Sequence, residues 1–304
     1  MESTGDVTVV VPTYDRQELL ERALDSVRNQ TVRPERVVVV DDASPDPVKS
    51  FVDDLYDADE LTVDVVRHDE NRGAAAARNT GVEAADTEYV AFLDSDDYWD
   101  EVKLAAQLAV FETDDVGLVY CDQYVVEPDG AVQKSGKELP DGDVWPPLLD
   151  GWTAPNTSTL VFDRDTFRDL GGFDTSLDSC QDHDLWMRLA REGVRVGVVE
   201  EPLSYFARDA DDRISHDYPA RMDGVDTFLE KWHGPIAEAQ SERAFQRFAA
   251  DYRAMAALPI AYGALLQRDL GTFVEVVRRY LLFNRSTYRL ALGSLPTLLR
   301  RLVR

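Results

Sequence analysis

Three carboxylates follow directly after an apolar run in the segment Phe92-Leu93-Asp94-Ser95-Asp96-Asp97. Acidic side chains gathered at the end of a buried strand are costly unless a cation or hydrogen-bond donors compensate their charge. Carboxylate oxygens are the ligands that hard divalent cations such as Mg²⁺ and Mn²⁺ prefer. The segment therefore predicts a divalent-metal site, and the alternative is an acidic turn in a chain rich in acids.

The preceding sequence alternates between strand-like and helix-like patterns. Apolar runs predict strands at 7–11, 37–40, 61–67 and 89–93, and helical periodicity predicts helices at 16–29 and 73–85. Asp15 and Glu18 resemble a capping box at the start of the first helix. Continuous valine runs between helices indicate an α/β fold with a mainly parallel, Rossmann-like sheet. Ligands bind beyond the carboxyl ends of such strands, where residues 13–15, 41–42 and 94–97 are expected to meet.

The second half of the chain continues this pattern and then changes to helix. We expect helices at 101–111, 164–170 and 181–192, strands at 116–121, 157–162, 194–199 and 203–206, and a loop at 136–155. After residue 216 the pattern is helical to the end. The sequence thus predicts an α/β unit at 1–215 and a helical C-terminal region at 216–304.

Composition limits the classes of partner. The chain has 304 residues, 44% of them hydrophobic, and a formal net charge of −26. It is long enough to bury a sizeable core, and its acidity argues against nucleic acid as a general partner. An acid excess with few lysines is typical of proteins from a salt-rich cytoplasm. With two cysteines, no secretory signal pattern and no long uncharged apolar run, we expect a protein on the cytoplasmic side.

The C-terminal segment 263–304 differs in charge from the rest. It carries eight arginines and two acidic residues, with apolar residues between the arginines at helical spacing. A basic amphipathic segment suits peripheral contact with an anionic membrane surface. The alternative is that its apolar stripe packs on the α/β unit.

Five motifs in this order together resemble family 2 glycosyltransferases of the GT-A fold. They are Val9-Val10-Val11-Pro12-Thr13-Tyr14-Asp15-Arg16, Val39-Val40-Asp41-Asp42-Ala43-Ser44, Asn71-Arg72-Gly73 with Ala77-Arg78-Asn79, residues 92–97, and Gln181-Asp182-His183-Asp184-Leu185-Trp186. The resemblance covers about residues 7 to 215. It implies transfer of a sugar from a UDP- or GDP-sugar donor with inversion at the anomeric carbon, assisted by Mn²⁺ or Mg²⁺.

The resemblance also implies roles for individual residues. Donor-binding residues would be Pro12, Thr13, Tyr14, Asp41, Asp42, Arg78, Asn79, Asp94, Arg208 and Arg213. Asp96 would be the direct metal ligand, with Asp94 beside it on the donor side. Asp182 would be the base that deprotonates the acceptor hydroxyl. The family commonly has Glu before this aspartate, where this chain has Gln181, so a neighbouring charge is missing.

Other interpretations stay open at this point. Asp41 and Asp42 could cap a loop, Arg78 could pair with surface acids, and Asp182 could be the N-cap of its helix. Asp94-Ser95-Asp96 also resembles the motif of phosphatases with an aspartyl nucleophile, although those have Thr where Tyr98 stands. A non-catalytic nucleotide-sugar or metal-binding module is a third possibility. For a transferase, the basic C-terminus suggests a lipid-linked acceptor, a dolichyl or polyprenyl phosphate glycan, in surface-glycan assembly or protein N-glycosylation.

Overall fold

The computed structural model describes residues 3–56, 61–136, 138–208, 218–266 and 268–281. The chain divides into two compact units. The first contains residues 1–148, 152–176 and 181–211, and the second contains residues 149–151, 177–180 and 212–304.

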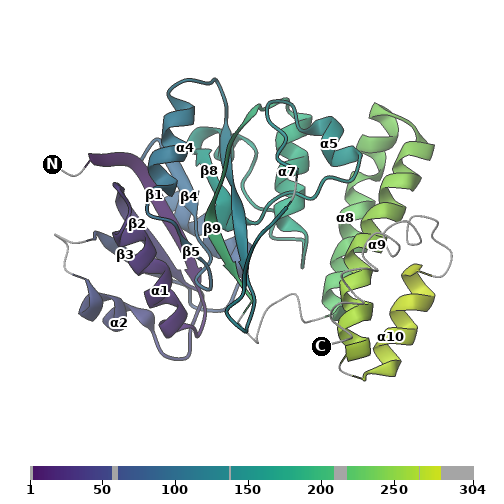
Figure 1. Cartoon of the computed structure of the whole chain (residues 1–304), viewed down its shortest axis with the longest axis horizontal. Coiled ribbons are helices and arrows are strands. Elements are labelled where there is room, and N and C mark those ends of the chain that lie inside the picture. The colour runs from purple at the N-terminus through teal and green to yellow at the C-terminus, as the bar shows by residue number, and fades with distance from the viewer. Residues whose placement is uncertain (1–2, 57–60, 137, 209–217, 267, 282–304) are drawn as a thin grey trace. The chain divides into compact units, whose positions relative to one another are not determined.

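The first unit is built on one nine-stranded sheet (Figure 1). Its strands are β1 (Ser3–Thr13), β2 (Val32–Asp41), β3 (Val63–Arg67), β4 (Tyr89–Phe92), β5 (Tyr98–Trp99), β6 (Leu118–Val126), β7 (Val132–Lys134), β8 (Leu160–Asp163) and β9 (Val196–Ala207). The strand order is β3-β2-β1-β4-β8-β6-β9-β5, and β7 pairs with β6. Strands β3, β2, β1 and β4 run parallel, whereas β8 is antiparallel to both neighbours. The expected α/β architecture is confirmed, and the sheet is mixed rather than mainly parallel.

Helices cover both faces of this sheet. They are α1 (Gln17–Arg28), α2 (Val48–Leu55), α3 (Ala74–Ala84), α4 (Lys103–Phe111), α5 (Trp145–Leu149), α6 (Arg164–Asp169) and α7 (Gln181–Arg191), with a 3₁₀ turn, η1, at Thr157–Thr159. Alternate residues of the parallel strands face α1, α2 and α4 in one apolar core. The opposite face packs on α3, where a Cβ on Gly81 would come within 2.2 Å of the Val10 side chain. Glycine at 81 thus lets α3 approach β1 closely.

Several elements differ from the sequence prediction. The expected strands 194–199 and 203–206 form the single strand β9, and the expected strand 157–162 is divided into η1 and β8. Helices α2 and α5 and strands β5 and β7 were not predicted. The two acids and the proline at 200–202 interrupt the apolar pattern, but the strand continues through them with an irregular register against β6. The capping box was wrong: the N-cap of α1 is Arg16, with no side-chain cap hydrogen bond. Asp15 has φ +54°, so the chain turns sharply before the helix begins.

The described residues of the second unit after residue 217 are mainly helical, and the predicted continuation of helix through residues 282–304 lies outside the described residues. This unit contains α8 (Tyr218–Ala239), α9 (Glu242–Leu266), α10 (Leu270–Val276) and a π-helical turn, η3, at Val277–Leu281. Helices α8 and α9 pack through stacked rings of Phe228 and Tyr252, whose centroids are 4.7 Å apart. Among the described helices, none combines the length and the apolar character needed to cross a membrane.

Candidate active site

Asp94, Asp96 and Asp97 lie together directly after β4, as the sequence predicted. One ligand oxygen from each lies within 4.8 Å of the others. The main-chain N–H of Asp97 donates to the carbonyl oxygen of Asp94 at 3.0 Å, and this hydrogen bond closes a tight turn. The turn brings three carboxylates close to each other, an arrangement that requires positive charge nearby.

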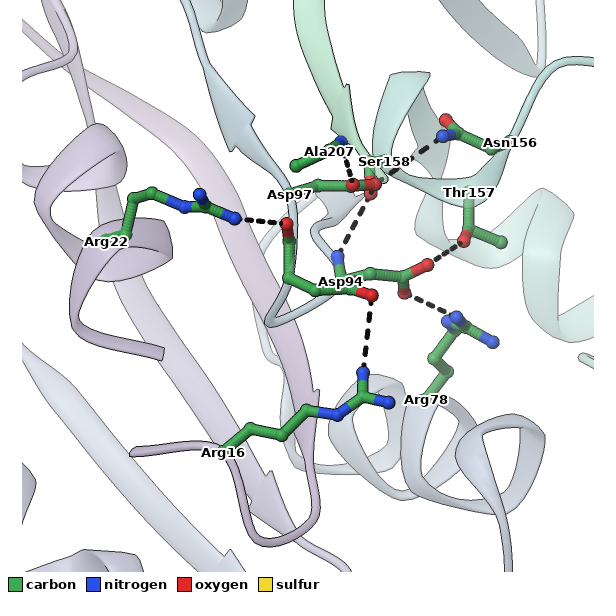
Figure 2. A network of polar contacts seen from close by, with 10 residues as sticks. Arg16, Arg22, Arg78, Asp94, Asp97, Asn156, Thr157, Ser158 and Ala207 are labelled. Atoms are coloured by element: carbon green, nitrogen blue, oxygen red, sulfur yellow. Dashed lines mark hydrogen bonds and ion pairs between the residues drawn. The ribbon is translucent and has the colours of Figure 1, made fainter. Parts of the chain in front are cut away.

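Guanidinium groups from other segments supply that charge (Figure 2). Arg16 Nη1 lies 3.3 Å from Asp96 Oδ2, and Arg78 pairs with Asp94 Oδ1. Arg22 Nη2 donates to the main-chain carbonyl of Asp96 at 2.6 Å. These arginines belong to the loop after β1, to α3 and to α1, so segments earlier in the chain hold the acidic turn.

Asp97, to which the sequence assigned no separate role, has a clear structural task. Its carboxylate accepts hydrogen bonds from Ser158 Oγ at 2.6 Å, from Ala207 N at 3.2 Å and from Asn156 Nδ2 at 3.5 Å. Ser158 Oγ in turn accepts from Asp94 N at 3.1 Å. Asp97, 1% exposed, thus ties the acidic turn to η1 and to the end of β9.

A buried lysine supports the same turn from behind. Lys103 is fully buried, and its Nζ lies 4.0 Å from the centre of the Trp99 ring. Trp99 Nε1 donates to Ser158 O at 2.7 Å, which connects the indole to the residue that holds Asp97. Burial lowers the pKa of Lys103 to about 8. Trp99 and Trp186 are both buried.

Asp182, the predicted base, shares its surroundings with Arg78. Its Oδ1 accepts a hydrogen bond from His183 N at 2.8 Å, and 37% of its side chain is exposed. Desolvation raises the pKa of Asp182, but the charge and hydrogen bonds of His183 and the positive charge of Arg78 outweigh it and hold that pKa below the usual range. Asp182 lies within the first turn of α7, not at its N-cap. The side chain is therefore ionised at neutral pH.

Helix α7 is fixed by the loop before it. Arg188 donates to Asp184 Oδ2 at 2.8 Å, to Gly172 O at 2.6 Å and to Leu170 O. Asn79 of α3 pairs with the main chain of Phe173, accepting at Oδ1 and donating from Nδ2, both at 2.8 Å. Asn79, predicted near the nucleotide, thus holds the loop that carries α7, and a nucleotide contact for it stays a prediction.

Asp41 and Asp42 are both buried and both engaged with the protein. Asp41 accepts from Ser44 N at 2.8 Å and Val48 N at 3.3 Å, and pairs with Arg67. Desolvation alone would raise the pKa of Asp41. The hydrogen bonds have the larger effect, so the pKa of Asp41 lies below its usual value.

Asp42 accepts from Arg72 N at 2.9 Å, from Gly73 N at 2.7 Å, and pairs with His68 Nδ1 at 2.7 Å. Both acids therefore shape the loops after β2 and before α3. Contact of either one with the donor base stays a prediction.

The other predicted donor residues are placed as follows. Pro12 and Thr13 end β1, and Thr13 Oγ1 is buried with no hydrogen-bond partner among the described residues. Tyr14 is 44% exposed. Arg208 follows Ala207, the residue that reaches Asp97, and pairs with Glu127 at 2.9 Å. Arg213 lies outside the described residues.

No role was predicted from the sequence for Arg16, Arg22, Thr157 or Ser158. Thr157 Oγ1 donates to Asp94 Oδ2 at 3.0 Å, so η1 contributes to the site through two adjacent hydroxyls. Arg16 belongs to one of the quoted sequence motifs, and this motif could have indicated it. No sequence signal indicated Arg22, Thr157 or Ser158, because their approach to the acids depends on how α1 and η1 pack.

Comparison with known proteins identifies the family. The profile described as "Glycosyl transferase family 2" matches residues 8–169, more than half of the chain. The chain belongs to glycosyl transferase family 2. This assignment confirms the expected class of enzyme and covers the residues of the acidic turn, but the matched region ends before Asp182.

Relatives and solved structures agree with the family. The "Pre-mycofactocin glycosyltransferase" of Mycobacterium tuberculosis is 36% identical over 214 residues, which cover 68% of this chain and 43% of that relative. This chain therefore spans less than half of that protein's length. The Escherichia coli "UDP-Glc:alpha-D-GlcNAc-diphosphoundecaprenol beta-1,3-glucosyltransferase WfaP" is 25% identical over 189 residues, covering 62% of this chain and 72% of that one.

A solved structure extends the likeness to the whole fold. The mannosyltransferase PcManGT of Pyrobaculum calidifontis, in complex with GDP-Man and Mn²⁺, superposes with a TM-score of 0.58 at 23% identity. The match covers 96% of this chain and 80% of that chain. It confirms the GT-A fold expected from the sequence.

Proposed function

We propose that this protein transfers a sugar from a UDP- or GDP-sugar to a hydroxyl of a glycan acceptor, with a divalent metal and with inversion at the anomeric carbon. The observation that carries the proposal is Arg78, which pairs with Asp94 on one side and lowers the pKa of Asp182 on the other. The donor-side acid and the base are thus neighbours of one guanidinium. Support comes from the family and from PcManGT, a protein of the same fold that was solved with GDP-Man and Mn²⁺.

The acidic turn fits a divalent metal. Its donor set consists of carboxylate oxygens from three residues within 4.8 Å, which suits Mg²⁺ or Mn²⁺ better than softer ions. Asp97 is held by hydrogen bonds to η1 and β9, so Asp96 is the proposed direct ligand and Asp94 its donor-side companion. When bound, such an ion stabilises the negative charge of the leaving nucleoside diphosphate.

The chain's own residues supply the remaining chemistry. Asp182 accepts the proton of the acceptor hydroxyl as that oxygen bonds to the anomeric carbon and the diphosphate oxygen leaves. The low pKa of Asp182 keeps its carboxylate ionised at neutral pH, which is the form that a base requires. A single base acting opposite the leaving group gives one displacement, and one displacement inverts the anomeric configuration.

A lipid-linked glycan is the proposed acceptor. The name of WfaP includes a diphosphoundecaprenol-linked sugar, which supports an acceptor of the polyprenyl or dolichyl class. The cytoplasmic membrane face is part of this proposal and is not given by that name. Leu270 and Val274 of α10 are 64% and 59% exposed and are followed by the exposed Arg278. Peripheral contact of α10 with an anionic bilayer would bring the enzyme to such acceptors. The experiment that tests this contact is co-sedimentation with anionic and with zwitterionic vesicles, and equal recovery of protein with both would contradict it.

The family assignment argues against an aspartyl-phosphatase. The geometry agrees, because both oxygens of Asp94, the residue that would be the nucleophile, are engaged by Arg78 and Thr157. A binding module without turnover is distinguished by experiment.

The test is thermal unfolding with a panel of UDP- and GDP-sugars, with Mn²⁺ or with chelator. One nucleotide class should raise the melting temperature in the presence of Mn²⁺, since a ligand that binds only the native state stabilises it. Asp96→Asn should lose most of this rise, whereas the control Asp115→Asn, at an exposed acid, should keep it. No rise with any nucleotide sugar would contradict the proposal, and binding without release of nucleoside diphosphate toward lipid-linked acceptors would favour the binding module.

A further inference from the structure

Arg16 pairs with the side chain of Asp96, the proposed direct metal ligand. Its Nη1 meets the carboxylate of Asp96, whereas Arg22 holds the main-chain carbonyl of the same residue (Figure 2). Arg22 therefore fixes the shape of the turn. Arg16 neutralises the oxygen that a metal ion would take.

The Arg16–Asp96 pair is long. A charge-assisted N–H···O bond is usually about 2.7–2.9 Å, and here the two atoms are 3.3 Å apart. The side chains are 19% and 11% exposed. The attraction between two charges falls as their distance grows, and a divalent cation carries twice the charge of the guanidinium, so it competes well for this carboxylate.

The local backbone is shaped to present this side chain. Asp15, a non-glycine residue, has φ +54°, a conformation that costs free energy. Its N–H donates to Ser44 Oγ at 3.0 Å, which holds the turn in place. At the N-cap of α1, where Ser, Thr, Asp or Asn would normally cap the helix, stands Arg16 without a side-chain cap bond. Helix α1 therefore begins without a side-chain cap, and Asp15 adopts a costly backbone conformation. Together these two features place the guanidinium of Arg16 at Asp96.

We propose that Arg16 is an exchangeable counter-ion of the acidic turn. It pairs with Asp96, yields that carboxylate to the metal, and then binds the diphosphate of the donor. This inference rests on the proposed function and adds a residue to it. The charges support the exchange, because a divalent ion on Asp96 makes the guanidinium surplus there, while an incoming diphosphate is an anion whose oxygens match the guanidinium fork.

The test is isothermal titration with Mn²⁺ alone, followed by titration with UDP and with GDP at saturating Mn²⁺. Arg16→Gln should bind Mn²⁺ alone about threefold to tenfold more tightly than wild type, because a competing cation is gone. The same variant should bind the nucleoside diphosphate about tenfold more weakly, because a phosphate contact is lost. The control Arg28→Gln removes one positive charge from the same helix, where Arg28 pairs with Asp25 at 3.0 Å, and should change neither affinity.

The sign of the Mn²⁺ change separates exchange from simple support. If Arg16 only braces the turn, Arg16→Gln binds Mn²⁺ more weakly than wild type, and this result overturns the proposal. Unchanged Mn²⁺ affinity or unchanged nucleotide affinity overturns it as well. If wild type binds neither UDP nor GDP, the proposed function fails, and the Mn²⁺ titration still decides whether Arg16 competes for Asp96.

Discussion

The hydrogen bonds of Asp97 allow a quantitative prediction. In Asp97→Asn, an amide NH₂ replaces one carboxylate oxygen, so it faces either the Ser158 hydroxyl or Ala207 N–H, both of which donate to Asp97. One buried charge-assisted hydrogen bond is lost. Such bonds contribute about 1.5–3 kcal/mol, and we expect the free energy of unfolding to fall by about 2 kcal/mol.

A double-mutant cycle assigns this cost to the Asp97–Ser158 bond. Urea unfolding of Asp97→Asn, Ser158→Ala and the double variant should give a coupling of about 1–2 kcal/mol, since the two residues share one contact at 2.6 Å. The control Asp115→Asn, at an exposed acid, should stay within about 0.5 kcal/mol of wild type.

The same variant should also affect the proposed donor site. Asp94 N donates to Ser158 Oγ, so loosening Ser158 loosens the turn that carries Asp94 and Asp96. We expect weaker Mn²⁺ and nucleotide binding in Asp97→Asn. Additive effects in the cycle, or wild-type stability of Asp97→Asn, would refute the reasoning that this carboxylate anchors the turn.

Two further variants test the residues behind the site. Burial lowers the pKa of Lys103 from 10.5 to about 8. Between these two pH values, the unfolded chain holds this proton and the folded protein does not. The free energy of unfolding should therefore rise as the pH increases from about 8 to about 10.5. Lys103→Met should lack this rise in urea unfolding measured across that range, and a difference between the two proteins that does not change with pH would contradict the assignment. Arg188→Ala removes the ion pair that Arg188 makes with the buried carboxylate of Asp184 and should lower the free energy of unfolding by about 3 kcal/mol. In assays of transfer, Arg188→Ala should reduce kcat more than donor affinity, since α7 carries Asp182; an equal loss of both would argue against a specific effect on the base.

Much of the fold could be predicted because its signals are local. Valine runs marked β1 and β2, a short apolar run marked β4, and the abrupt change from Leu93 to Asp94 marked the acidic turn. The sequence predicted two strands in place of β9, because Glu200 and Glu201 interrupt the apolar pattern. In the structure, pairing with β6 continues on both sides of these residues, and β9 is one strand. The antiparallel course of β8 followed from no local signal, since strand direction depends on connections between distant segments.

The candidate site was predictable where motifs carried it and not where packing did. Asp96 and Asp182 stand in sequence motifs, whereas the hydroxyls of Thr157 and Ser158 reach the acids only because η1 lies against β4. For Asp41 and Asp42, the contact with the donor that their motif implies stays a prediction, whereas their partners within the protein followed from no sequence signal. The salt-adapted interpretation of the acidic composition stays a prediction.

The central claim is a division of labour between Asp96, which serves the metal and the donor, and Asp182, which serves as the base. The most direct measurement compares nucleotide-sugar binding with Mn²⁺ and sugar transfer in Asp96→Asn and Asp182→Asn. The account predicts that Asp96→Asn loses both, and that Asp182→Asn binds the donor like wild type but loses transfer. Transfer at the wild-type rate by Asp182→Asn, or wild-type donor binding with Mn²⁺ by Asp96→Asn, would contradict it.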